Sequence, residues 1–235
     1  MEFHPEKCQV LRVSKKRNPI YSGSYSLHGH MLEIVDHAKY LGVTVQGDLR
    51  WDRHISNMVK KANSTHAVLK RNVRVSSKAT KSAAYKSLVR PHLEYCATVW
   101  DPHTKCAINK IESVQRRSAR WTCNSYGINS TGPTALMSEL EWPSLQSRRQ
   151  NSRLCLLYKM KNDLVKCPYN SLLCPYPYIT KNKPAHALNP IDLNPRKQYF
   201  TNTFFPRTVR DWNSLPPSTA LAPSLEAFKA SLVAG

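Results

Sequence analysis

The stretch KYLGVTVQGDLRWDRHI, residues 39–55, contains the change from a strand pattern to a helix pattern. Closely spaced apolar side chains in its first half predict one buried strand. These side chains are Tyr40, Leu41, Val43 and Val45. Gly47 and Asp48 predict the turn that ends this strand, and Asp52 is the expected N-cap of the helix that follows. A sheet therefore ends here and a helical region begins.

The sequence before residue 39 predicts a few short strands. Residues 8–14, CQVLRVS, alternate imperfectly between apolar and polar side chains, as a half-buried strand does. Residues 26–35 predict two more short strands, because Gly29 tolerates the positive φ of a hairpin turn. With residues 39–45 this makes about four strands, which we expect to form one small antiparallel sheet.

The sequence after residue 51 carries apolar side chains at helical spacing. The first predicted helix runs from residue 52 to residue 72. A second begins after Ser76 or Ser77 as its cap, and Pro91 either kinks this helix or opens a third. A further helix is expected in residues 104–123, with basic residues toward its C-terminal end.

The C-terminal part of the sequence combines helices with a proline-rich segment. Ser144 is the expected cap of a helix over residues 144–160. Residues 167–203 hold six prolines and few periodic apolar positions, which predicts a loop-rich segment. The strings PRTVRDWNSLPP and SLEAFKASLV predict two short terminal helices around a proline turn.

These patterns define an α+β fold class. We expect a small antiparallel β-sheet in residues 1–50 and a mainly α-helical bundle in residues 51–165. A Pro-rich, loop-rich region with short C-terminal helices follows in residues 166–235.

The composition points to a polyanionic partner. The chain has 35 Lys and Arg against 15 Asp and Glu, a formal net charge of +20 that exceeds what solubility requires. Ribosomal or chromatin-like proteins, membrane-surface proteins and nucleic-acid enzymes share such a charge. No stretch approaches the roughly 20 apolar residues of a membrane span, so no membrane partner is expected.

The sequence start and the cysteines bear on the compartment. The start MEFHPEKC lacks the apolar core of a signal peptide, so we expect an intracellular protein, in either nucleus or cytoplasm. The seven cysteines predict reduced thiols, because an odd number without a secretory signal does not suggest a disulfide framework.

The sequence offers no catalytic residues and no metal ligands. Two-metal phosphoryl transfer needs carboxylates that reach two ions about 3.5 to 4 Å apart. The nearest acidic pairs lie at a turn and at a helix end, at Asp48 with Asp52 and Glu139 with Glu141. Cys167, Cys174 and His186 have spacing too irregular for a zinc site.

Two basic groups on predicted helices are the candidate nucleic-acid-binding residues. The first group is Lys60, Lys61, Lys70, Arg71 and Arg74, and the second is Arg116, Arg117 and Arg120. Their cations can neutralise phosphates, and an aromatic side chain such as Trp121 can stack on bases. The alternative is a solvated helix face with Trp121 in the core.

Four strings carry a resemblance to a known family. They are FHPEKC at residues 3–8, KYLGV followed by LRWDRHI at residues 39–55, YKSLVRPHLEYCATVWDP at residues 85–102 and FFPRTVRDWNSLP at residues 204–216. The chain resembles the end of the palm, the thumb and the C-terminal extension in reverse transcriptases of non-LTR retrotransposons, the LINE elements of the jockey and CR1 type. The resemblance extends over most of the chain.

The resemblance implies roles for four residues. Lys7 matches the lysine of the palm's fourth motif, thought to act near the departing pyrophosphate. Tyr40, Leu41 and Gly42 match the primer-grip strand. Without the resemblance, Lys7 is equally consistent with a solvated turn residue, and Tyr40 and Leu41 with the core.

The resemblance also implies a function. The chain is expected to be a truncated RNA-directed DNA polymerase that lacks the catalytic aspartates and is inactive alone, with Mg²⁺ needed only by a complete parent polymerase. Its expected partners are the backbones of RNA template and primer duplex, together with the missing fingers and palm portion. Two alternatives remain: a duplex-binding module without sequence preference, and a gene-model fragment without a selected role.

Overall fold

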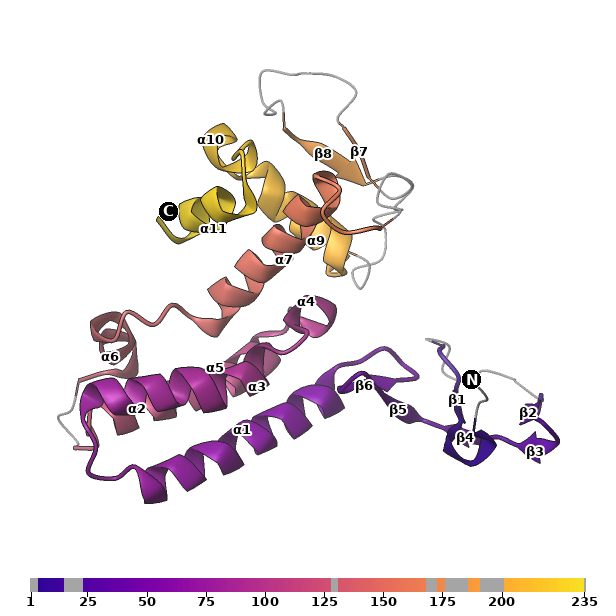
Figure 1. Ribbon diagram of the computed structural model, residues 1–235, viewed down its shortest axis with the longest axis horizontal. Helices are drawn as coiled ribbons and strands as arrows, with labels where there is room; N and C mark the ends of the chain where they lie inside the picture. Colours follow the sequence, from indigo (N-terminus) through magenta and orange to yellow (C-terminus); the bar gives the residue numbers. More distant parts are fainter. Residues whose placement is uncertain are drawn as a thin grey trace. The chain divides into compact units, whose positions relative to one another are not determined.

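The computed structural model describes residues 4–14, 23–127, 131–167, 173–175, 186–190 and 201–234. Its contacts divide the chain into two compact units (Figure 1). Unit 1 consists of Met1–Leu93 and Thr104–Asn124, and unit 2 consists of Glu94–His103 and Ser125–Gly235. Within the described residues, no helix combines the length and the apolar character needed to span a membrane.

The elements of unit 1 are short strands followed by helices. The strands are β1 (Gln9–Leu11), β2 (Ser26–Leu27), β3 (His30–Met31), β4 (Glu33–Val35), β5 (His37–Tyr40) and β6 (Val43–Gln46), preceded by the 3₁₀ helix η1 (Pro5–Lys7). The helices are α1 (Asp52–Asn72), α2 (Lys78–Ala84), the π-helix η2 (Tyr85–Val89), α3 (Arg90–Glu94), whose last residue belongs to unit 2, and α5 (Lys105–Thr122). The predicted α+β fold class is confirmed.

The described strands of unit 1 form three separate two-stranded ladders instead of the one sheet that we expected. β2 pairs with β3 and β5 with β6 in antiparallel order, whereas β1 pairs with β4 in parallel. The strands are only two to four residues long. Strands this short give each ladder only a few backbone hydrogen bonds.

The predicted buried strand around Tyr40 is instead a hairpin, so this prediction was wrong. Leu41 and Gly42 have φ values of 46° and 86° and make the tight turn between β5 and β6. Two successive positive φ values are typical of a turn that matches the twist of a hairpin. Tyr40 is 70% exposed and Leu41 is 74% exposed, while Val43 just after the turn is buried.

The end of β6 is held against the start of α1. The expected N-cap, Asp52, is instead the first residue of α1, and the N-cap position is Trp51, whose side chain makes no capping hydrogen bond. The Oε1 atom of Gln46 takes this role, because it accepts the backbone N–H of Arg53 at 3.1 Å. The backbone N–H of Thr44 also donates to Nδ1 of the buried His54 at 3.2 Å. Side chains from the strand and the helix therefore join the hairpin to α1.

The predicted helices of unit 1 are confirmed with small changes. The apolar stripe of α1 is buried at Ile55, Met58, Val59, Ala62 and Leu69. Ser77 caps α2, since its Oγ accepts the backbone N–H of Thr80 at 3.2 Å. Pro91 lies in the first turn of α3, directly after the π-turns of η2, so this proline opens a helical segment there.

Unit 2 contains the remaining described elements. They are α4 (Ala97–Trp100), α6 (Pro133–Glu139), α7 (Leu145–Lys161), β7 (Leu173–Pro175), β8 (Leu188–Pro190), α9 (Phe204–Asn213), α10 (Pro217–Ala220) and α11 (Leu225–Ala234). The predicted Ser144 cap is confirmed, because its Oγ accepts the backbone N–H of Ser147 at 3.0 Å. The rest of the proline-rich segment lies outside the described residues.

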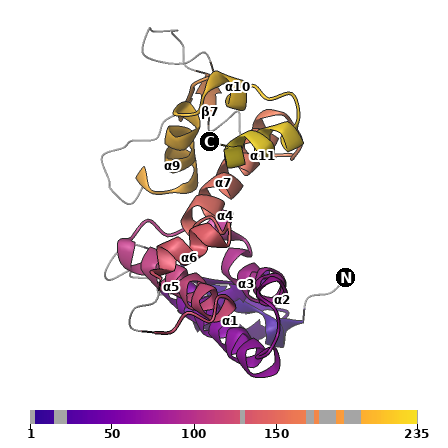
Figure 2. The ribbon, with the colours of Figure 1, turned by 90° about the vertical axis from the view of Figure 1, so that its left-hand side faces the viewer.

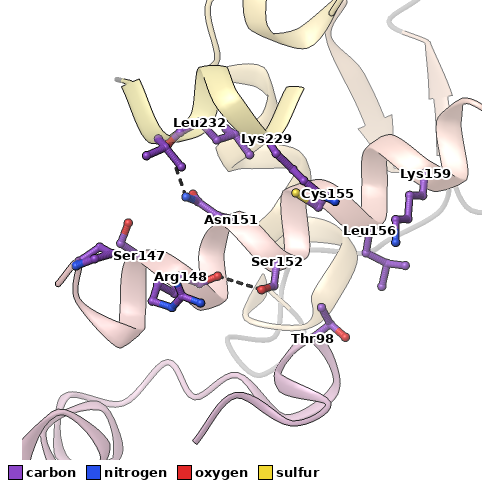
Figure 3. A pocket seen from close by; sticks show the side chains of 12 residues that line it. Thr98, Ser147, Arg148, Asn151, Ser152, Cys155, Leu156, Lys159, Lys229 and Leu232 are labelled. Atoms are coloured by element: carbon purple, nitrogen blue, oxygen red, sulfur yellow. Dashed lines mark hydrogen bonds between the residues drawn. The ribbon is translucent and has the colours of Figure 1, made fainter. Parts of the chain in front are cut away.

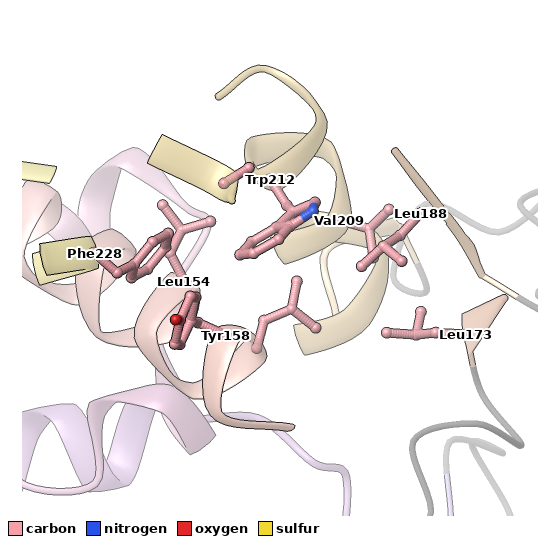
Figure 4. Packing of buried hydrophobic residues seen from close by; sticks show 9 residues of the cluster. Leu154, Tyr158, Leu173, Leu188, Val209, Trp212 and Phe228 are labelled. Carbon is pink, nitrogen blue, oxygen red and sulfur yellow. The ribbon is translucent and has the colours of Figure 1, made fainter. Parts of the chain in front are cut away.

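The apolar core of unit 2 lies between α7, α9 and α11 (Figure 4). Trp212 of α9 and Phe228 of α11 are fully buried, and the Phe228 ring stacks on Tyr158 of α7 with 4.6 Å between centroids. The polar ends of these aromatic residues are also satisfied. The Trp212 indole donates to the carbonyl of His186 at 3.1 Å, and the Tyr158 hydroxyl donates to the carbonyl of Ala222 at 2.7 Å.

A buried charge network adjoins this core. Asp101, which follows α4, accepts Arg149 Nε at 2.8 Å and Arg153 Nε at 2.9 Å from α7. Arg207 of α9 approaches the same carboxylate at 3.2 Å, and Asp211 accepts Arg153 Nη2 at 2.9 Å. Burial lowers the pKa of Arg207, and Asp101 opposes this shift.

This network joins two of the strings that carry the family resemblance. The side chains of Asp101, Arg149 and Arg153 are at most 4% exposed, although no local pattern in the sequence predicts arginines on the buried side of α7. Asp101 lies near the end of the string at residues 85–102, whereas Arg207 and Asp211 lie in the string at residues 204–216, about 100 residues further along the chain. In this structure those positions build the interior of unit 2.

Candidate nucleic-acid interface

The two predicted basic groups lie on neighbouring helices of unit 1. α1 and α5 pack side by side (Figures 1 and 2), and two cations of α5 donate to polar residues of α1. Lys110 Nζ donates to Ser56 Oγ at 2.7 Å, and Arg117 Nη2 donates to Asn63 Oδ1 at 2.9 Å. The basic sides of the two helices therefore meet along one seam.

Helical geometry shows which lysines of α1 lie near that seam. At about 100° per residue, Lys60 and Lys70 lie within roughly 60° of Asn63 around the α1 axis, and Arg71 lies about 80° from it. On the same estimate, Arg120 lies about 60° from Arg117 around the α5 axis. Lys61 lies about 160° from Asn63 on the same estimate. Lys61 instead acts on His92 of α3, whose pKa is lowered first by burial and then by the charge of Lys61. The structure thus separates Lys60 from Lys61, although the two are adjacent in the sequence.

Arg117 and Lys70 both act on His66 of α1. The pKa of His66 is lowered to about 4, first by burial and then by the charges of Arg117 and Lys70. Both helices therefore place positive charge around one half-buried imidazole, which is kept neutral at physiological pH. A neutral histidine adds no further repulsion at this crowded position.

We call the cations on this side of the helix pair the α1–α5 basic face. Its members are Lys60, Lys70, Arg71, Lys110, Arg117 and Arg120, all of which are exposed. Lys110 was not among the predicted binding residues, although its spacing of seven from Arg117 places both on one side of α5. Arg74 is exposed just after α1. Arg116 is half-buried and donates to the carbonyl of Asn109 at 3.3 Å along its own helix.

Trp121 belongs to the core of unit 1 and is not available for base stacking. Its side chain is only 3% exposed. The ring packs edge-on against His66 with 5.4 Å between centroids, and Lys81 Nζ lies 5.6 Å from the Trp121 ring centroid. The buried Lys81 donates to Asn124 Oδ1 at 2.7 Å. Of the two interpretations of Trp121, base stacking or a core position, the structure supports the core position.

The residues that resemble palm motifs lie in the N-terminal part of unit 1. Lys7 is the last residue of η1 and is exposed. Tyr40, Leu41 and Gly42 form the exposed tip of the β5–β6 hairpin. Positive φ at Gly42 suits a glycine, whereas Leu41 adopts the left-handed region that most side chains avoid. This backbone geometry presents Tyr40 and Leu41 to solvent.

The described residues include no cluster of three or more His, Cys, Asp or Glu side chains that could hold a metal ion. Cys167 and His186 are described, but of the residues between them the structure describes only 173–175.

The fold and the surface together define a strongly basic α+β protein with cations gathered on a pair of packed helices. The chain is similar to an RNA-directed DNA polymerase from the mobile element jockey of Drosophila melanogaster, with 32% identity over 125 residues. The match covers 51% of this chain and 13% of that polymerase. This similarity supports a relation to the reverse transcriptases of retrotransposons. No family model and no solved structure matches the chain.

Proposed function

We propose that this chain corresponds to the C-terminal part of a LINE-type reverse transcriptase, with the end of the palm, the thumb and a C-terminal extension. In this proposal the chain grips the backbone of a nucleic-acid duplex without reading its sequence. The observation that carries the proposal is the α1–α5 basic face. The similarity to the jockey polymerase supports the choice of nucleic acid as the polyanion.

The chemistry of the face suits backbone contact. Its members end in ammonium or guanidinium groups, which neutralise phosphates and release condensed counterions. Arg117 is held by its bond to Asn63, which fixes its direction before any ligand binds. Trp121, the aromatic residue of α5, is buried, so phosphate contact is favoured over stacking on bases.

We propose that Lys61, Arg74 and Arg116 contribute less than the α1–α5 basic face. Lys61 lies on the other flank of α1, and Arg116 is half-buried against its own helix. Arg74 lies beyond the end of α1, so its position is not fixed by the helix.

We also propose that the chain has no polymerase activity by itself. The sequence has no pair of carboxylates on one strand that could hold two metal ions, so Mg²⁺ would act only in a complete polymerase. Primer extension on an RNA template tests this directly, and incorporation of any nucleotide would refute it. The exposed Tyr40 and Leu41 are proposed to meet primer or the missing palm portion in such an assembly.

The decisive experiment is fluorescence anisotropy with a labelled primer–template duplex over a range of salt concentrations. If the face neutralises about five phosphates, the slope of log K against log salt is about −4.5. Replacing Lys60, Lys70, Arg71 and Arg117 by Ala removes four of these contacts and is expected to make the slope less negative by about 3.6.

A matched pair of single variants controls for net charge. Lys60→Ala and Lys61→Ala remove the same group from adjacent exposed positions of α1. Lys60→Ala should reduce the slope by about 0.9, whereas Lys61→Ala should leave it nearly unchanged. Equal effects of the two variants would show that binding follows net charge and not the α1–α5 basic face. If the folded chain does not bind the duplex, the alternative that it is a fragment without a selected role is favoured.

A further inference from the structure

Unit 2 contains a groove that the proposed function does not use. It has a volume of about 680 Å³ and lies between α7 and α11, with α4 at one side (Figure 3). Asn151 Nδ2 of α7 donates to the carbonyl of Leu232 of α11 at 3.4 Å, which joins the two helices at the groove. A groove of this size is in the range that binds small ligands or several side chains of a partner.

The lining of the groove combines apolar and cationic groups. Leu156, Leu232 and Cys155 supply apolar surface between the two helices. Arg148, Lys159 and Lys229 supply positive charge, and none of the residues that line the groove is acidic. Arg148 is already paired with Glu94, so Lys159 and Lys229 are the cations left for a partner.

The two lysines lie close enough together to act on one group. Burial raises the pKa of the Cys155 thiol, and both Lys229 and Lys159 oppose this shift. Figure 3 shows Lys229 on α11 and Lys159 on α7, with Cys155 labelled between the two helices. Neither lysine forms an ion pair within the described residues.

From this lining we infer that the groove between α7 and α11 binds an acidic amphipathic helix of a partner protein. Leucine-like side chains of the partner would contact Leu156 and Leu232, and its carboxylates would pair with Lys159 and Lys229. A second copy of this chain is disfavoured as the occupant, because each copy carries a formal charge of +20. Nucleic acid is disfavoured because apolar side chains and a thiol form much of the lining.

The test uses the full chain and a fluorescein-labelled helical peptide. The peptide has about 18 residues, or five turns, with Leu along one side and Glu on the others. We expect binding that weakens at least about tenfold when Lys159 and Lys229 are both changed to Glu. The control variant Lys166→Glu changes an exposed lysine of the same unit that does not line the groove, and it should bind the peptide normally.

Alkylation of Cys155 shows where the peptide binds. The peptide should slow the reaction of Cys155 with iodoacetamide but leave the exposed Cys106 of unit 1 unaffected. Absence of peptide binding, equal weakening by Lys166→Glu, or an unchanged Cys155 rate would each overturn the inference. Protection of Cys155 by a primer–template duplex but not by the peptide would assign the groove to nucleic acid and would also overturn it.

Discussion

Replacing Asp101 by Asn tests the buried charge network of unit 2. Asp101 accepts hydrogen bonds from Arg149 and Arg153, and Arg207 lies 3.2 Å from the same carboxylate. The substitution keeps the size of the side chain and removes its charge. Arg149 reaches Asp101 through Nε, and its two terminal nitrogens have no hydrogen-bond partner among the described residues, so Arg149 depends on Asp101.

The expected loss of stability is large. At about 4 Å and an effective dielectric constant near 20, each guanidinium–carboxylate pair is attracted by about 4 kcal/mol. Removing one partner of a buried pair costs about 3 to 5 kcal/mol, because the other charge stays buried without compensation. Asp101 serves three arginines, so we expect a loss of about 5 kcal/mol in the free energy of unfolding of unit 2.

Hydrogen exchange measured by mass spectrometry resolves the two units. Asp101→Asn should reduce protection of α7, residues 145–161, by nearly four orders of magnitude, since about 1.4 kcal/mol corresponds to a factor of ten, while α1 in unit 1 keeps its protection. Asp163→Asn makes the same charge change at an exposed position of unit 2 and should have little effect. If Asp101→Asn reduces α7 protection by less than about fivefold, the network does not stabilise unit 2 and the reasoning fails.

Three further predictions concern unit 1. The stability of unit 1 should fall as the pH drops from 6.5 toward 4, because the unfolded chain protonates His66 in this range while the folded chain keeps it neutral. An NMR titration that gives His66 a pKa near 6.5 in the folded chain would contradict this. Gly47→Ala should destabilise unit 1 by more than about 1 kcal/mol in urea unfolding, because a Cβ atom would lie 2.5 Å from the backbone oxygen of Arg12. Ser77→Ala should cost about 1 kcal/mol by loss of the α2 cap, whereas Ser77→Asp, which keeps a capping oxygen, should cost less.

The helices and their caps could be predicted from the sequence because their signals are local. The spacing of apolar residues predicted α1 with the bounds that the structure has, and Ser77 and Ser144 were recognised as caps by residue type and position. The same periodicity separated the basic residues of α1 from its buried side. A helical projection of the sequence also shows that Lys60 and Lys61 lie on different sides of α1.

The hairpin and the buried arginines could not be predicted in this way. A leucine at positive φ is uncommon, so Leu41 indicated a strand and not a turn. Arg149 and Arg153 are buried only because Asp101 lies opposite them, 48 and 52 residues earlier in the chain. No local window contains both the arginines and their partner, and an arginine without a known partner is normally assigned to the surface.

The discontinuous make-up of unit 2 has a consequence for synthesis on the ribosome. Unit 1 has all of its residues once Asn124 has left the exit tunnel, but the network in unit 2 also requires Asp211. At about 5 to 20 residues per second, Asp211 follows Asn124 by roughly 4 to 17 seconds. Before the end of that interval, Asp101 lacks one or more of its partners Arg153, Arg207 and Asp211. Unit 1 is therefore expected to fold first, and unit 2 only near the end of translation.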